Sequence, residues 1–250
     1  MTLRAHRRLG QHFLVDNRGV DLFLELLGAF EGRDFLEVGP GLGALTIDAS
    51  RIARRLVAVE IDPLLAERLS RRLPPNASVV VGDGVSFVLA TTLDVVFSNS
   101  PFYLTGRLVA AAARNNNIRT VVIGCQKEVA DRLVAKPGDH DYGRLSVMAQ
   151  AFFDVSLKGH IPAEWFRPRP NVDAALVMMK RRRPWGPDGE VLEKVTRCLF
   201  TQRNRVAGKV ARYCLPGIPI KGWGERRVRE LTPDQLLEVS SWLAGVAGGK

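Results

Sequence analysis

The amino-acid sequence predicts an α/β fold, a parallel sheet with helices on both faces, followed by a small helical C-terminal domain. Two observations support this. Short apolar runs alternate with longer stretches of helical character over most of the chain, as strands and helices do in layered α/β proteins. A cluster of charge, proline and glycine at Arg181–Pro187 ends that alternation, and the pattern beyond it is helical. We expect a large domain at 1–183 and a small one at 184–250.

The expected elements follow in chain order. The first two strands are separated by a helical stretch, Ala44–Arg55. In the C-terminal part, Leu192–Leu199 has helical character. Thr232 is a suitable N-cap, because Pro233 favours the first helical position and Gln235 lies three residues after the cap. The seven expected strands are Phe35–Val38, Leu56–Glu60, Val79–Val81, Leu93–Ser98, Thr120–Gly124, Phe152–Leu157 and Ala174–Met179.

Composition excludes several classes of protein. No apolar run is long enough to span a bilayer, and the first ten residues lack the pattern of an export signal, so we expect a cytoplasmic protein without membrane contact. The cysteines, Cys125, Cys198 and Cys214, are too few and too scattered for a disulfide framework or a zinc site. We expect buried or incidental thiols and no metal.

The net charge of +10 is concentrated in one segment. Between Lys180 and Glu230 there are 14 Lys or Arg and five Asp or Glu, which leaves an excess of one positive charge for the rest of the chain. Such a concentration is typical of proteins that bind a phosphate backbone, so we expect the small helical domain at 184–250 to bind RNA. A merely solvated basic surface is the alternative interpretation.

Four candidate ligand-binding residues stand at or just after the ends of four expected strands: Gly39, Glu60, Asp83 and Asn99. In an open α/β sheet, ligands bind outside the carboxyl ends of the strands. We therefore expect these residues to converge on one crevice.

The glycine-rich loop Glu37–Gly43 allows a tight turn and a close approach of the backbone to a nucleoside or phosphate. Read as Gly39-x-Gly41-x-x-Ala44, it also fits a nicotinamide-dinucleotide loop, with Glu60 as the ribose acid. S-adenosylmethionine is favoured, because the Glu37 carboxylate would repel a pyrophosphate and Asp83 could accept from an adenine amino group. Asp83 could equally be a helix N-cap, and Asp62 a turn acid.

The tetrapeptide Asn99-Ser100-Pro101-Phe102 suggests methylation of an exocyclic amino group on a base. Such a nitrogen is a poor nucleophile, because its lone pair is delocalised into the ring. The Asn99 side-chain oxygen and the Ser100 carbonyl could accept both N–H hydrogens and stabilise the developing positive charge. The ring of Phe102 could stack on the base.

Further motifs resemble the KsgA-type family of small-subunit ribosomal RNA adenine dimethyltransferases, whose relatives include erythromycin-resistance methyltransferases. They are Leu9–Asp16, Gln126–Ala130, Tyr142–Val147 and Phe166–Ala175, in the family's order. The resemblance implies a Rossmann-like S-adenosylmethionine-dependent methyltransferase sheet, and it implies that Phe102 and Phe166 sandwich a flipped adenine. The expected catalytic set is Asn99, Ser100, Pro101, Phe102 and Phe166. The expected cofactor set is Gln11, His12, Leu14, Glu37, Gly39, Gly41, Glu60, Ile61, Asp83, Gly84 and Asn99.

The resemblance further implies dimethylation of two adjacent adenosines near the 3′ end of small-subunit rRNA, in an immature ribosomal subunit, by a monomer. The chain departs from the family at Ser100, usually aliphatic, and at Phe102, usually Tyr. The alternatives are a resistance-type large-subunit methyltransferase, a DNA adenine methyltransferase, a nicotinamide dehydrogenase and an assembly factor that mainly binds. Tyr142–Val147 argues against the resistance type.

Overall fold

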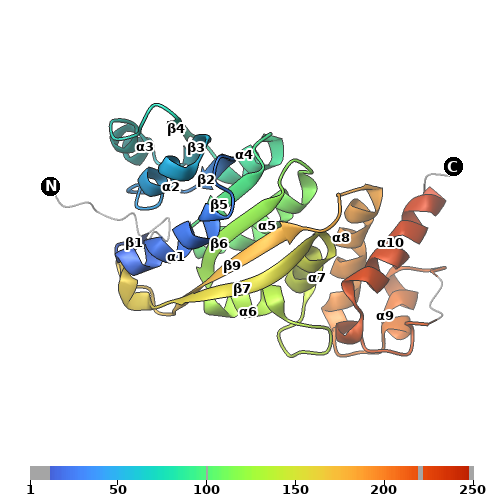
Figure 1. Ribbon diagram of the computed structural model, residues 1–250. Helices are drawn as coiled ribbons and strands as arrows, with labels where there is room; N and C mark the ends of the chain where they lie inside the picture. The colour runs from blue at the N-terminus through green and yellow to red at the C-terminus, as the bar shows by residue number, and fades with distance from the viewer. Residues whose placement is uncertain (1–11, 100, 219–221, 248–250) are drawn as a thin grey trace. The chain divides into compact units, whose positions relative to one another are not determined.

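A seven-stranded sheet in the order β4-β3-β2-β5-β6-β9-β7 positions the site (Figure 1). Strands β2 to β6 pair in parallel, and β9 is antiparallel to β6. The strands β2, β5 and β6 are buried along almost their whole length, as expected for a parallel sheet covered on both faces. The strands are β2 (Asp34–Val38), β3 (Arg55–Glu60), β4 (Ala77–Val81), β5 (Val95–Ser98), β6 (Thr120–Gln126), β7 (Phe153–Ile161) and β9 (Ala174–Arg181).

All seven predicted strands are present, with ends that differ by up to two residues in most of them, but two elements differ more in length. The strand expected at 152–157 continues to Ile161 in β7. The helix expected at 44–55 is the shorter α2, Thr46–Ile52, because Ala53 already has an extended backbone. The remaining helices around the sheet are α1 (Asn17–Gly28), α3 (Pro63–Ser70), α4 (Gly84–Ala90), α5 (Thr105–Arg114) and α6 (Lys127–Val134).

A second, two-stranded sheet joins distant segments of the chain. Strand β1, Phe13–Leu14, pairs antiparallel with β8, Phe166–Arg167. Leu14 lies opposite Phe166, and both side chains are buried in the main core. This pairing brings the N-terminal segment to the late motif that begins at Phe166.

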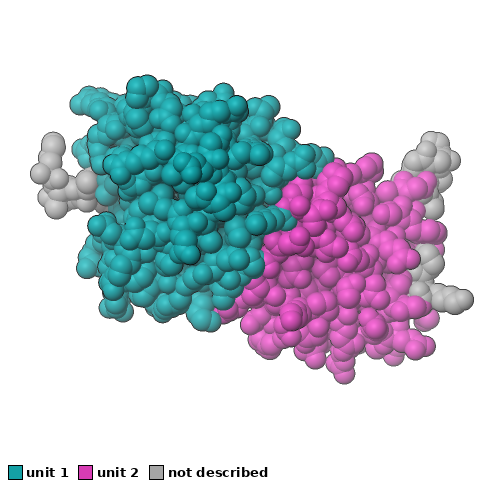
Figure 2. Space-filling model, in the orientation of Figure 1, with its two compact units in different colours: residues 1–130, 156–180 teal, residues 131–155, 181–250 magenta. Residues whose placement is uncertain are grey.

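This computed structural model describes residues 12–99, 101–218 and 222–247, and the chain forms two units (Figure 2). Residues 1–130 and 156–180 form the first unit, which contains most of the sheet. Residues 131–155 and 181–250 form the second. The expected domain division at 183 stays a prediction.

The second unit contains α7 (Arg144–Phe152), α8 (Pro187–Leu199), α9 (Ala207–Cys214) and α10 (Pro233–Ala247). The predicted start of α10 is confirmed: the Gln235 N–H donates to Thr232 Oγ1 over 3.1 Å, and the Thr232 N–H donates to Gln235 Oε1 over 3.0 Å. Two backbone donors are thereby satisfied. Just before this helix, the carbonyl of Leu231 accepts from the hydroxyl of the fully buried Tyr142 over 2.8 Å.

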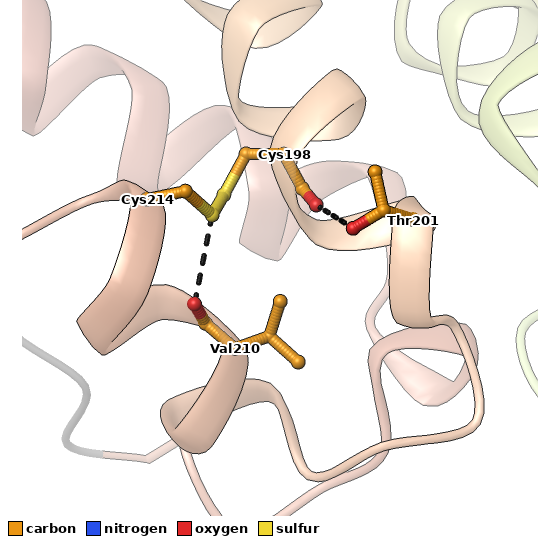
Figure 3. Close-up of a disulfide and its surroundings, with 4 residues drawn as sticks. All are labelled: Cys198, Thr201, Val210 and Cys214. Atoms are coloured by element: carbon orange, nitrogen blue, oxygen red, sulfur yellow. Dashed lines mark hydrogen bonds between the residues drawn. A yellow bond between two sulfur atoms is a disulfide. The ribbon is translucent and has the colours of Figure 1, made fainter.

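Cys198 and Cys214 form a disulfide, with Cα atoms 6.0 Å apart (Figure 3). The expectation of incidental thiols is therefore wrong for these two residues. The bond joins the end of α8 to the end of α9, and the 16-residue separation in sequence does not reveal that the two helix ends meet. Cys125 is a buried thiol in β6.

Candidate active site

One pocket of the first unit collects most of the predicted site residues at the carboxyl ends of the parallel strands. Gly39, Glu60, Asp83 and Asn99 all line it, so the expected crevice exists. The other predicted residues that line it are His12, Leu14, Glu37, Gly41, Ile61, Gly84 and Pro101. Two predicted residues, Gln11 and Ser100, lie outside the described residues.

The glycine loop forms one wall of the pocket. Gly41 has φ +56°, and a Cβ at this position would lie 2.9 Å from the ring of Phe13, so both the backbone conformation and the space require glycine. The Gly41 N–H donates to Glu60 Oε2 over 2.9 Å, and the Asp62 N–H donates to Glu60 Oε1 over 3.0 Å. Each oxygen of Glu60 is thus oriented by a backbone donor and retains capacity to accept another hydrogen bond.

Two carboxyl groups beside this loop are buried. Glu37 is 2% exposed, and its Oε2 has no hydrogen-bond partner. Burial, the largest cause, and the nearby charge of Glu60 together raise the pKa of Glu37 to about 8. Burial also raises the pKa of Glu60, against the two backbone hydrogen bonds. A cationic group or a hydrogen-bond donor bound in the pocket would stabilise the ionised forms of both carboxyl groups and lower their pKa values.

Asp62 and Asp83 are both helix caps. Asp62 Oδ1 accepts from the Leu64 N–H over 2.8 Å at the start of α3, and Asp83 Oδ1 accepts from the Val85 N–H over 2.9 Å at the start of α4. The side chain of Asp83 is 44% exposed and also lines the pocket, where Arg107 lies 3.5 Å from its Oδ2. The cap and the ligand interpretations of Asp83 are therefore compatible.

Asn99 follows β5 directly and has an acceptor that nothing in the described chain uses. Its Oδ1 is buried and has no hydrogen-bond partner. The neighbouring strand β6 makes room for it at Gly124, where a Cβ would lie 2.7 Å from Asn99 Oδ1 and 3.1 Å from the ring of Phe23. A buried unpaired acceptor is costly, so its position at a pocket indicates a ligand donor.

The rings of Phe102 and Phe166 do not form two parallel walls. Phe166 is 1% exposed and meets Phe102 edge-on, with centroids 6.5 Å apart and planes at 73°. The ring that stacks on Phe102 is His12, at 6.0 Å and 23°. His12 Nδ1 donates to the carbonyl oxygen of Pro168 over 2.8 Å, which holds the imidazole in place. The roles of Phe102 and Phe166 at a target base stay a prediction.

Sequence reasoning missed several lining residues, including Phe13, Tyr103, Leu104 and Arg107. Phe13 lies inside the N-terminal motif, and Tyr103 is adjacent to the catalytic tetrapeptide, so both had a local signal. Arg107 had none, because its place depends on how α5 packs beside α4.

Within residues 12–99, 101–218 and 222–247, no helix is both long and apolar enough to cross a bilayer. In the same ranges, no three His, Cys, Asp or Glu side chains are grouped as metal ligands would be.

Known proteins resemble this chain over nearly its whole length. The family model for ribosomal RNA adenine dimethylases matches residues 2–244. A probable ribosomal RNA small subunit methyltransferase A from Aeropyrum pernix is 45% identical over 203 residues, which cover 80% of this chain and 73% of that protein. Its counterpart from Pyrobaculum islandicum is 37% identical and covers 93% of each chain.

Solved structures share the fold. A dimethyladenosine transferase from Plasmodium falciparum has a TM-score of 0.80 at 20% identity, over 94% of this chain and 98% of that one. A 23S rRNA methyltransferase has a TM-score of 0.68 at 24% identity, over 92% and 98%. Because the family model spans almost the entire sequence, the chain belongs to the ribosomal RNA adenine dimethylase family.

Proposed function

We propose that this protein transfers methyl groups from S-adenosylmethionine to N6 of two adjacent adenosines near the 3′ end of small-subunit rRNA, during ribosome biogenesis. The observation that supports this best is the unpaired, buried Oδ1 of Asn99, which stands at the end of β5 in the same pocket as Glu37 and Glu60. An amino group that donates a hydrogen bond is the complement of such an acceptor.

The pocket fits S-adenosylmethionine in its charge and in its donors and acceptors. Glu60 suits a ribose diol, and Asp83 with Gly84 and Ile61 suits the adenine end; all four residues line the pocket. The unpaired Glu37 Oε2 suits a positively charged methionine portion, with His12 and Leu14 nearby on the lining and Gln11 preceding them. When bound, this cofactor supplies an activated methyl group on a cationic sulfur.

The residues of the catalytic loop would act on the amino nitrogen. Asn99 Oδ1 and the backbone carbonyl of Ser100 accept its two hydrogens, which keeps electron density on nitrogen and favours the charge that develops as the new bond forms. Pro101 sets the direction of the loop, and Phe102 stacks on the base. Phe166, which is buried and meets Phe102 edge-on, would have to turn toward the base to cover its other face. The nitrogen becomes acidic only once it is methylated, so no strong base is required.

The target is supported by the names of the relatives. Both curated relatives described above are small subunit methyltransferases, which favours the small-subunit site over a large-subunit site. The concentrated positive charge between Lys180 and Glu230 supports an RNA partner. We further propose that the protein acts as a monomer in the cytoplasm, on an immature ribosomal subunit.

Replacing Asn99 tests the proposal. We expect Asn99→Ala to lower kcat on small-subunit rRNA by about 10²–10³-fold, the usual loss for one transition-state acceptor or donor. Calorimetric titration with S-adenosylmethionine should give an unchanged Kd within about two-fold. Asn17→Ala, which alters an exposed asparagine at the start of α1, is the matched control. Full activity in the Asn99 variant would refute the assignment, and mass spectrometry of the rRNA would identify the modified adenosines.

A further inference from the structure

Two aromatic rings at the catalytic loop face each other. The imidazole of His12 and the ring of Phe102 have centroids 6.0 Å apart and planes at 23°, and both side chains are half-buried. A flat base that touches a ring on each of its faces needs walls about 7 Å apart, twice the usual contact distance of ~3.5 Å. The two rings therefore have the orientation of such walls, and they need to separate by at least about 1 Å to admit a base.

Phe166 has neither the orientation nor the exposure of a wall. Its ring meets Phe102 edge-on, and it is 1% exposed within the main core, where it lies opposite Leu14. A base stacked on Phe166 requires this side chain to leave the core, which forfeits the burial of an aromatic ring. A base stacked on His12 requires only a small shift of a half-buried ring. The difference in cost favours His12.

The chain around His12 holds the imidazole close to Phe102. His12 Nδ1 donates to the carbonyl oxygen of Pro168 over 2.8 Å. Strand β1 begins at the next residue and pairs with β8, and just beyond it the Val15 N–H donates to the carbonyl of Trp165 over 2.9 Å. Complete removal of the imidazole breaks the first of these bonds, whereas a shift of about 1 Å strains it only slightly. We therefore expect a base to enter beside the imidazole and not to replace it.

His12 also lines the pocket that contains Asn99, whose buried Oδ1 has no partner. A base between His12 and Phe102 would thus stand beside that acceptor. We propose that His12 is a substrate-positioning residue, whose imidazole sandwiches the flipped target adenine against the ring of Phe102. Histidine and other aromatic side chains hold unstacked RNA bases in this way. The inference rests on the proposed function, since it takes Phe102 to stack on the base, and it moves the second wall from Phe166 to His12.

Two substitutions separate the ring of His12 from its hydrogen bond. His12→Asn removes the ring and keeps a side-chain N–H for Pro168, whereas His12→Phe keeps a ring and loses the hydrogen bond. We expect His12→Asn to lower kcat/KM for small-subunit rRNA about five- to 150-fold, the usual loss for one base–aromatic stack, and His12→Phe to stay within about three-fold of the wild type. S-adenosylmethionine is kept saturating for each variant, because His12 lines the same pocket.

The matched control is His140→Asn. It makes the same substitution in the second unit, at a histidine whose side chain is 89% exposed, and should leave kcat/KM unchanged. Thermal melting of each variant checks that it folds as the wild type does.

A binding experiment detects the stack without methyl transfer. The probe is a small-subunit rRNA fragment with 2-aminopurine at one target adenosine, because the fluorescence of this base is quenched by stacking on an aromatic ring. Bound to His12→Asn, the probe should be brighter than when bound to the wild type or to His12→Phe. With an abasic residue at the target position, the wild type and His12→Asn should bind with the same Kd within about two-fold, since nothing stacks.

The outcomes separate this inference from the proposed function. If His12→Asn leaves kcat/KM and probe fluorescence unchanged while the wild type methylates rRNA, the inference is overturned and the proposed function stands. An equal loss in His12→Phe and His12→Asn would assign the effect to the hydrogen bond with Pro168 and also overturn it. A brighter probe with Phe166→Leu but not with His12→Asn would make Phe166 the second wall. If fluorescence responds as expected but the wild type methylates no adenosine, the base site is supported and the proposed function fails.

Discussion

At the scale of single residues, the site depends on the space that Gly124 leaves for Asn99. Gly124→Ala would place a methyl group 2.7 Å from Asn99 Oδ1, closer than atoms in contact approach. We expect the asparagine to shift and kcat to fall at least about ten-fold, as for other small displacements of a reacting geometry. The Kd for S-adenosylmethionine should change little. Gly106→Ala, an open position in α5, is the control, and equal kcat in the two variants would contradict the argument.

Glu37 predicts a pH dependence of stability. Burial raises its pKa from 4.5 to about 8, so between these pH values the folded chain retains a proton that the unfolded chain has lost. The free energy of unfolding therefore falls as pH rises through this window. Glu37→Gln carries no such proton. The free energy of unfolding of this variant minus that of the wild type should therefore be larger at pH 8 than at pH 5, by an amount on the order of a few kcal/mol.

Urea unfolding of both proteins at the two pH values measures this difference. Glu31→Gln, at an exposed position after α1, is the control for loss of a surface charge. If the free energy of unfolding changed equally between the two pH values in the wild type and in Glu37→Gln, Glu37 would have an ordinary pKa in the folded protein, and the prediction would be wrong. A bound cation at Glu37 should lower its pKa, so saturating S-adenosylmethionine is expected to reduce the difference.

At the scale of elements, the sequence predicts those features that follow from the order of strands and helices or from residues close together in the chain. Gly39, Glu60, Asp83 and Asn99 reach one pocket because parallel strands end at the same edge, and this follows from strand order alone. The cap at Thr232 is confirmed for a similar reason, since its partner is three residues away.

Contacts between distant short segments could not be predicted. Strands β1 and β8 have two residues each, too few for any periodicity, yet their pairing places His12 over Phe102. The disulfide between the ends of α8 and α9 depends on how two helices pack, and the spacing of Cys198 and Cys214 contains no such information. The joining of residues 131–155 to the second unit is likewise a property of packing.

The disulfide should stabilise the ends of α8 and α9. It closes a loop of 16 residues, for which the loss of chain entropy in the unfolded state is worth about 3 kcal/mol. We expect Cys198→Ser/Cys214→Ser to lower the free energy of urea unfolding by about 2–3 kcal/mol. Reductant should lower the wild type to the same level and leave the variant unchanged. Wild-type unfolding that is insensitive to reductant would contradict a formed bond.

At the scale of the whole molecule, the arginines of the basic segment that produces most of the net charge of +10 fall into two structural classes. Arg182 and Arg183 lie 3.0 Å and 3.2 Å from Asp234, and the guanidinium of Arg181 lies 4.6 Å from the centre of the Phe153 ring. These groups are engaged within the second unit. In contrast, five arginines form no ion pair with a carboxylate of the described residues: Arg203, Arg205, Arg226, Arg227 and Arg229. Position in sequence places both groups in the same basic segment, but only one of them is available to a phosphate backbone.

This division predicts that the triple-arginine run contributes to folding more than to RNA binding. Arg182→Gln/Arg183→Gln should lower the free energy of unfolding by about 1 kcal/mol, since partly exposed ion pairs are worth ~0–1 kcal/mol each. Affinity for a small-subunit rRNA fragment should change less than about three-fold, with the salt slope retained. Asp234→Asn removes the same ion pairs without removing positive charge, and it should reproduce the loss of stability. A salt slope reduced by about 1.4, that is ~0.7 for each lost phosphate contact, would instead place Arg182 and Arg183 in the RNA-binding surface.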